Sequence, residues 1–224
     1  MKVQGAPQTL PDEHISIWSL PAGDAQSGGD WCEVVELSED LLALTVGDVS
    51  GHGIAVAATR ASVLVRVLRA IQHMHDPAAV LAVANAFAFS CGEGVIVTAI
   101  VAFWNRRLQT LTFANAGHPP PLLLSGDCQA FLEHLTADLP LGIYAQHSAA
   151  NYVIALPSDA LLVLYTDGIT EHNRDEVRGE ADLSEAARLV FDQPELDDAR
   201  AIARDIFRTG SGHDDAAIMV VRTT

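Results

Sequence analysis

Four acidic positions in this sequence could do chemistry, because each stands where an apolar segment meets small residues. They are the pairs Gly29-Asp30 and Gly47-Asp48, the segment Thr166-Asp167-Gly168 and the pair Asp214-Asp215. A carboxylate at the end of a buried strand is held rigidly, and glycines beside it let a ligand approach the backbone closely. Each aspartate taken singly also fits an ordinary turn or helix cap, and Asp48 and Ser50 could simply cap the helix expected after them. If the four converge, their mutual repulsion calls for cations.

These side chains offer oxygen ligands only. The sequence contains no Cys-x-x-Cys or His-x-x-x-His pair, so nothing in it suggests a zinc site. Oxygen ligands favour Mg²⁺ or Mn²⁺. The aspartates therefore predict a site for hard divalent cations.

Serine and histidine residues near these aspartates have more than one interpretation. Ser50 has no base and orienting group around it in the sequence, so we do not expect a nucleophilic serine. His52 could donate a proton, orient a water or pack its loop against the sheet. His118 is expected to stabilise a turn, His213 could contact a substrate phosphate, and the remaining histidines, His172 among them, are expected at the surface.

Hydrophobic periodicity predicts the elements that position these residues. Strands are expected at residues 14–20, 31–37, 41–46, 95–104, 109–116, 121–124, 130–135, 152–156, 160–165 and 216–222, and helices at 53–72, 77–89, 183–191 and 195–209. Residues 1–13 form a loose lead-in. The pattern predicts a single α+β domain over residues 14–224, a four-layer α-β-β-α sandwich with two antiparallel sheets flanked by helix pairs.

Composition excludes several classes of protein. The 224 residues are 49% hydrophobic, which indicates a globular chain, and no apolar run is long enough to span a bilayer. The formal net charge of −16 argues against nucleic acid as a partner. Three scattered cysteines suggest reduced thiols in a cytoplasmic protein, with neither nucleic acid nor membrane as a partner.

Six segments occur together in the order and approximate spacing of one family. They are GGDW (28–31), GDVSGHG (47–53), FANAGHPPPLLL (113–124), LPLGI (139–143), LVLYTDGITE (162–171) and HDDAAIMVVR (213–222). The chain resembles the bacterial metal-dependent protein serine/threonine phosphatases of the SpoIIE/RsbU type, a branch of the type 2C superfamily. The resemblance covers roughly residues 14–222 and implies the same sandwich fold as the periodicity.

The resemblance implies a set of metal ligands. Asp48 matches the aspartate that bridges two metal ions and positions the attacking water, with the backbone carbonyl of Val49 as a further ligand. Asp30 matches an acidic residue that binds the metal site directly or through water. Asp167 and Asp214 match the aspartates that hold the other metal ion.

Other positions would support these ligands without binding a metal ion themselves. Asp215 and Gly168 fall in this group, with His52 as a further candidate. Glu33 stands where many relatives have a second aspartate, and Ala217 stands where Thr or Ser is common. With these two departures we still expect catalytic activity, but the sequence does not determine the exact geometry of the metal site.

The function implied is hydrolysis of phosphoserine or phosphothreonine by a metal-activated water, with two divalent cations, Mn²⁺ or Mg²⁺, as cofactors. The implied substrate is a phosphorylated STAS-domain regulator of sigma-factor or stress signalling, such as an anti-anti-sigma factor or a stressosome scaffold. A catalytically weak module that sequesters such a regulator is the alternative. A diguanylate cyclase, suggested by GGDW alone, leaves the other segments unexplained.

Many relatives carry a sensor or receiver segment ahead of the catalytic domain, whereas here about a dozen residues precede the first predicted strand. We therefore expect a stand-alone catalytic domain similar to RsbX, which is always on or is switched on by a separate activator. A fragment of a longer protein is equally compatible with the sequence.

Overall fold

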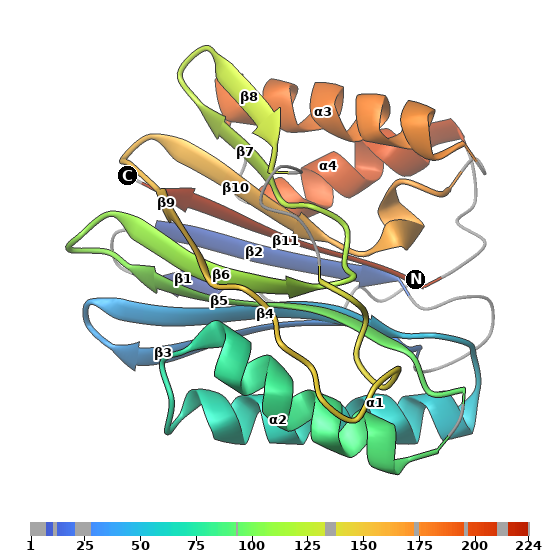
Figure 1. Cartoon of the computed structure of the whole chain (residues 1–224). Coiled ribbons are helices and arrows are strands. Elements are labelled where there is room, and N and C mark those ends of the chain that lie inside the picture. Colours follow the sequence, from blue (N-terminus) through green and yellow to red (C-terminus); the bar gives the residue numbers. More distant parts are fainter. Residues whose placement is uncertain are drawn as a thin grey trace. The chain divides into compact units, whose positions relative to one another are not determined.

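The computed structural model describes residues 8–10, 13–20, 28–92, 94–132, 138–172, 175–194, 197–209 and 215–223. Their secondary structure is α+β, with two antiparallel sheets that each carry a helix pair (Figure 1). The chain divides into two compact units. Unit 1 comprises Met1–Gln26, Pro121–Leu132 and Pro157–Thr224, and unit 2 comprises Ser27–Pro120 and Glu133–Leu156.

Unit 2 contains a five-stranded sheet in the order β3-β4-β5-β6-β9. Its strands are β3 (Trp31–Ser38), β4 (Leu41–Val49), β5 (Val97–Asn105), β6 (Thr110–Ala116) and β9 (Tyr152–Ala155). The β4–β5 ladder is unbroken from the Leu41–Asn105 pair to the Val49–Val97 pair. Nearly every residue of β4 and β5 is buried, which explains why these strands appear in the sequence as continuous apolar runs.

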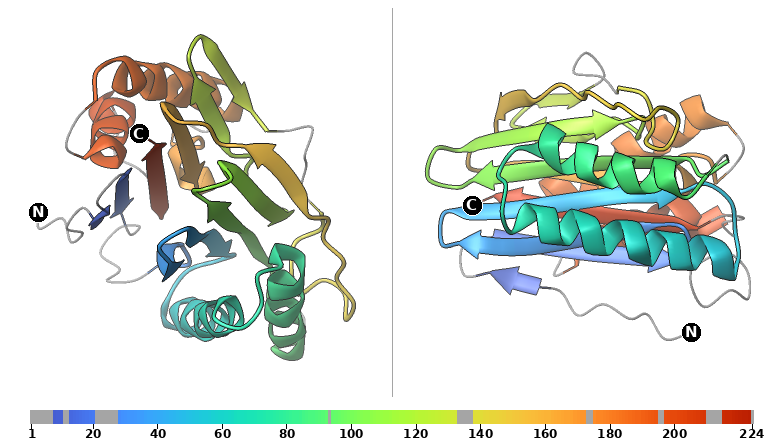
Figure 2. Two further views of the ribbon diagram at one scale, coloured as in Figure 1. Left: turned by 90° about the vertical axis from the view of Figure 1, so that its left-hand side faces the viewer. Right: turned by 60° about the horizontal axis from the view of Figure 1, so that its bottom comes forward.

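Two helices, α1 (Ile54–Ile71) and α2 (Pro77–Ser90), lie side by side on this sheet (Figure 2). The buried side chains of α1 recur at helical spacing, as the periodicity predicts: Val63, Val67, Ala70 and Ile71. They pack with Ala43, Val101 and their neighbours into one apolar cluster on the helix side of the sheet.

The start of α2 is fixed by Asp76 and Pro77. The Asp76 carboxylate accepts a hydrogen bond from the Ala79 N–H at 3.1 Å and another from the Asn151 side-chain amide at 2.8 Å. Asn151 in turn accepts from the Ala78 N–H at 2.9 Å. The cap therefore also ties α2 to the segment that leads into β9.

Unit 1 contains a six-stranded sheet in the order β1-β2-β11-β10-β7-β8. Its strands are β1 (Gln8–Leu10), β2 (Glu13–Leu20), β7 (Leu122–Ser125), β8 (Cys128–Phe131), β10 (Ala160–Tyr165) and β11 (Ala216–Thr223). The helices α3 (Glu176–Asp192) and α4 (Asp198–Ile206) pack against this sheet. The short helix η3 (Phe207–Thr209) follows α4. Arg222 of β11 joins both helices, because its guanidinium donates to Asp198 at 2.9 Å and to the Val190 carbonyl at 2.7 Å.

The structure corrects three boundaries. Strand β1 lies within residues 1–13, which were predicted to be a loose lead-in. Helix α3 begins at Glu176, well before the predicted residue 183. The prediction missed its first turns because they are polar and contain Gly179, a poor helix former. Glycine is needed at this position, since a side chain at residue 179 would overlap the Thr170 carbonyl. Strand β8 covers Cys128–Phe131 where 130–135 was predicted, and residues 133–137 lie outside the described chain.

The α+β class and the two antiparallel sheets with their helix pairs are confirmed. Among the helices of the described residues, none combines the length and apolar character needed to cross a membrane.

Candidate metal centre

In unit 2, strand register brings two of the predicted acids together. Trp31 of β3 pairs with Gly47 of β4. The Val49 N–H donates to the Gly29 carbonyl at 3.3 Å, so the chain just before β3 stays next to the end of β4 and brings Asp30 near Asp48. Two neighbouring carboxylates repel each other unless a cation lies between them.

The faces of the sheet separate these acids from Glu33. Ala43 and Val49 of β4 belong to the cluster under the helices, so alternation turns Asp48 to the opposite face. Trp31 and Val35 of β3 belong to the same cluster, so Glu33 between them lies on the helix side. The carboxylate of Glu33 therefore does not join that of Asp48.

Gly29 leaves room for two oxygen ligands. A Cβ atom at residue 29 would overlap the Val49 carbonyl oxygen and lie 2.5 Å from Oδ1 of Asp48. Both oxygens thus border the space that a side chain at residue 29 would fill. A carboxylate and a backbone carbonyl are the hard oxygen ligands that Mg²⁺ and Mn²⁺ prefer, so these residues fit the predicted cations.

The turn after Asp48 is held by the backbone. The Ser50 N–H donates to the Ile96 carbonyl at 3.0 Å, and Gly51 and Gly53 have φ angles of 105° and 99°, which favour glycine. Gly53 is the N-cap of α1 and no side chain caps the helix, so Asp48 and Ser50 are not helix caps. His52 is exposed, so it does not pack the loop against the sheet.

A buried histidine supports the strand next to Asp48. Asp48 pairs with Thr98 of β5, whose hydroxyl lies 2.9 Å from Nδ1 of His118. The Asn115 side chain accepts from the His118 N–H and donates to its carbonyl, both at 2.8 Å. The turn is thus held by the Asn115 side chain and the main chain of His118, and the predicted turn role of the His118 side chain stays a prediction. Its link to Thr98 depends on strand register and was not predicted.

An arginine that we did not single out from the sequence lies beside Asp30. Arg60 of α1 donates from Nη1 to the Asp30 carbonyl at 3.1 Å. Burial raises the pKa of the Glu33 carboxyl, and the Arg60 guanidinium opposes that shift. Burial also raises the pKa of the Cys32 thiol well above its ordinary value, with the charges of Asp30 and Glu33 acting in the same direction.

In unit 1, Asp167 begins the short helix η2 (Asp167–Ile169) directly after β10, and its side chain is exposed. The Thr166 hydroxyl accepts from the Ala217 N–H at 2.8 Å, which ties this turn to β11. Asp215 is buried, and a Cβ atom at Gly168 would overlap its carbonyl. The turn that carries Asp167 therefore packs directly on the chain at Asp215.

His172 corrects a prediction, because it is buried and not at the surface. Nδ1 of its ring lies 3.0 Å from the Ile169 carbonyl, and Nε2 lies 3.6 Å from Asp182 of α3. His172 thus anchors the Asp167 turn to α3. Asp214 and His213 lie outside the described residues, and their predicted roles stay predictions. Within the described part of the chain, no group of three or more His, Cys, Asp or Glu could hold a metal ion.

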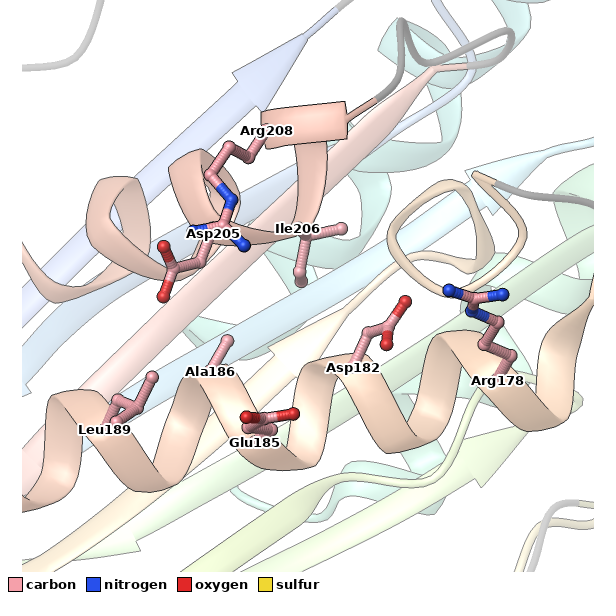
Figure 3. Close-up of a pocket in the computed structure, with 8 residues that line it drawn as sticks. All are labelled: Arg178, Asp182, Glu185, Ala186, Leu189, Asp205, Ile206 and Arg208. Carbon is pink, nitrogen blue, oxygen red and sulfur yellow. The ribbon is translucent and has the colours of Figure 1, made fainter.

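None of the predicted acids lines either of two cavities in the described part of the chain. One of about 330 Å³ is lined from α3 by Arg178, Asp182 and Glu185 and from α4 and η3 by Asp205 and Arg208 (Figure 3). The other, of about 450 Å³, is lined in unit 2 by Phe89, Ile96, Ile143 and glycines. The sequence analysis assigned no function to either set of residues.

The sequence of this chain matches a known protein family and curated relatives. The family model of stage II sporulation protein E (SpoIIE) matches residues 38–224. The phosphoserine phosphatase RsbP of Bacillus subtilis is 25% identical over 177 residues, which are 76% of this chain and 44% of RsbP. This chain therefore spans less than half the length of RsbP.

Solved structures share the fold. The structure of the RsbU and RsbW domains of Rv1364c from Mycobacterium tuberculosis matches 97% of this chain and 61% of that one, with a TM-score of 0.87 and 25% identity. The structure of RsbX in complex with magnesium matches both chains over their full length, with a TM-score of 0.76 and 14% identity. The fold is that of type 2C phosphatase domains of the RsbU kind. The chain belongs to the SpoIIE family.

Proposed function

We propose that this chain is a phosphatase domain that hydrolyses phosphoserine or phosphothreonine on a protein, using Mn²⁺ or Mg²⁺. One observation carries the proposal: in a member of the SpoIIE family, Oδ1 of Asp48 and the Val49 carbonyl border a single space beside Gly29. The phosphoserine phosphatase RsbP and the magnesium-containing RsbX structure support it.

The proposed ligands are those that the sequence predicts. Asp48, the Val49 carbonyl and Asp30 would hold a cation in unit 2, and Asp167 and Asp214 are proposed as ligands as well. The bridging role of Asp48 belongs to the same proposal. When bound, two divalent cations activate a water and hold the phosphate oxygens of the substrate.

The residues of this chain contribute rigidity and charge. The β4–β5 ladder and the Ser50–Ile96 hydrogen bond fix Asp48 and Val49, so their oxygens need little reorganisation when a cation binds. In hydrolysis, the water oxygen forms a bond to phosphorus, the bond to the serine or threonine oxygen breaks, and that oxygen takes a proton. His52, exposed in the same turn, is proposed to donate this proton or to orient the water.

The proposed substrate is a phosphorylated STAS-domain regulator or a stressosome scaffold, and the proposed regulation is by a separate activator. The similarity to RsbP, RsbU and RsbX proteins supports this substrate class. A matched comparison of a phosphorylated STAS protein with an unrelated phosphoserine protein tests it, because only the first should be hydrolysed at low enzyme concentration.

The decisive experiment measures hydrolysis of p-nitrophenyl phosphate and of a phosphoserine STAS protein, with and without Mn²⁺. We expect turnover that needs Mn²⁺ and falls at least about 100-fold in Asp48→Asn, which loses a ligand charge. Asp40→Asn is the matched control, because Asp40 is an exposed acid in the β3–β4 turn. Equal rates in wild type and Asp48→Asn would contradict the proposal. Tight binding of the STAS protein without turnover would favour the sequestering module.

A further inference from the structure

Helix α1 places an arginine on its buried face. Arg60 precedes Val63 and Val67, both fully buried, by three and seven residues, so the three side chains lie on one side of the helix. An arginine is seldom found on such a face without a polar partner. Its Nη1 donates to the Asp30 carbonyl at 3.1 Å. Its Nε is buried and has no hydrogen-bond partner among the described residues.

The contact supplies a hydrogen-bond donor to a main-chain carbonyl that points away from the neighbouring strand. Strand β3 is an edge strand of its sheet, so every second carbonyl points away from β4 and lacks a strand partner. The Gly29 carbonyl points inward and accepts from Val49, so the Asp30 carbonyl points outward. Arg60 donates a hydrogen bond to this outward carbonyl.

Charge reinforces the arrangement. Glu33 lies on the helix side of β3, where the guanidinium of Arg60 favours its ionised form. Arg60 reaches Asp30 at its main-chain carbonyl. Arg60 therefore acts on Asp30 through the main chain, while its charge also acts on Glu33.

We propose that Arg60 is a positioning residue, which fixes the main chain at Asp30 so that its carboxylate faces Asp48 for cation binding. The inference rests on the cation site of the proposed function and not on the identity of the substrate. Groups that orient metal ligands typically contribute 10–100-fold to metal affinity.

The test measures Mn²⁺ binding directly, by calorimetry and by the rise in melting temperature on adding Mn²⁺. Arg60→Met keeps the aliphatic packing and removes the donor. We expect it to weaken Mn²⁺ binding about tenfold or more while the melting temperature without metal changes little. Arg60→Lys, which keeps a charged donor, should recover part of the affinity. Arg69→Ala is the matched control, because Arg69 is exposed on the same helix.

Several outcomes would overturn the inference. Wild-type Mn²⁺ affinity in a folded Arg60→Met would show that the contact does not position Asp30. Failure of Arg60→Met to fold, or an equal loss of stability with and without Mn²⁺, would show that Arg60 serves only folding. If the wild type binds Mn²⁺ but hydrolyses no phosphoprotein, the proposed function is contradicted. The inference about Arg60 would still be supported in that case if Arg60→Met binds Mn²⁺ more weakly than the wild type.

Discussion

At the scale of single residues, Gly29 is where the acidic site is most tightly constrained. Its neighbours on one side are the Val49 carbonyl and Oδ1 of Asp48, and its own carbonyl accepts a hydrogen bond from the Val49 N–H. A hydrogen atom in place of a side chain is thus what allows Asp48 and Val49 to present oxygens to the same space. We therefore expect this residue to affect cation affinity at the proposed site without being a ligand.

We predict that Gly29→Ala weakens Mn²⁺ binding strongly and lowers stability by about 1–3 kcal/mol, the usual cost of overpacking. The new methyl group must displace the Val49 carbonyl or the Asp48 carboxylate. Calorimetric titration with Mn²⁺ and urea unfolding measure the two effects. Gly92→Ala is the control, because its Cβ atom would meet nothing within 4 Å, so any strain from its φ of 99° should lower stability alone. Unchanged Mn²⁺ affinity in Gly29→Ala would contradict the proposed ligands.

At the scale of elements, the start of α2 depends on one carboxylate. The Asn151 amide, and then the Ala79 N–H, lower the pKa of Asp76 below its ordinary value of 3.8, and burial opposes them only weakly. A carboxyl with a lowered pKa in the folded state adds stability above its unfolded pKa. That contribution is lost as the pH falls through its folded pKa.

We therefore predict that Asp76→Ala lowers the free energy of unfolding by about 1 kcal/mol near neutral pH, the usual value of a helix N-cap. The difference from wild type should begin to shrink near about pH 4, where Asp76 of the unfolded chain takes up a proton, and should be lost at still lower pH, once the folded state is protonated too. Urea unfolding across this pH range measures it. Asp76→Asn keeps an acceptor without the charge and should show little pH dependence. A penalty that stays constant down to the lowest pH would contradict the role of the charge.

At the scale of the whole molecule, the dominant property is an excess of negative charge. The formal net charge is −16, and the proposed site gathers some of these carboxylates, which repel each other without a cation. A ligand that binds only the folded state stabilises it by mass action. Cation binding and the stability of the whole chain are therefore linked.

We predict that Mn²⁺ at about 100 times its dissociation constant stabilises the chain by about 2.7 kcal/mol per site. For a chain of this size that corresponds to a rise of roughly 5–10 °C in melting temperature. Excess EDTA should reverse the shift. Potassium chloride at matched ionic strength controls for general screening of the net charge. If potassium chloride raised the melting temperature of the wild type as much as Mn²⁺ does, no specific site would be responsible. The same would follow if Mn²⁺ raised the melting temperature of Asp48→Asn as much as that of the wild type.

Much of the architecture could be predicted from the sequence, and the acidic candidates could be named from it, because both depend on local patterns. A continuous apolar run marks strand β10, a period-3.6 repeat marks helix α1, and a glycine beside an aspartate is visible in the chain itself. Arg60 also carried a local signal, since its spacing from Val63 and Val67 places a charged residue on a buried helix face.

Tertiary structure alone decided which of these residues meet. The segment that carries Asp30 lies next to the end of β4, and Thr98 pairs with Asp48 and contacts His118, because strand register brings together residues far apart in sequence. The pleat put Glu33 on the other face, where it meets Arg60. His172 is buried because α3 and its loop cover a histidine that no local pattern distinguishes from a surface one. Local patterns depend on a few neighbouring residues, whereas register and packing are set by the chain as a whole.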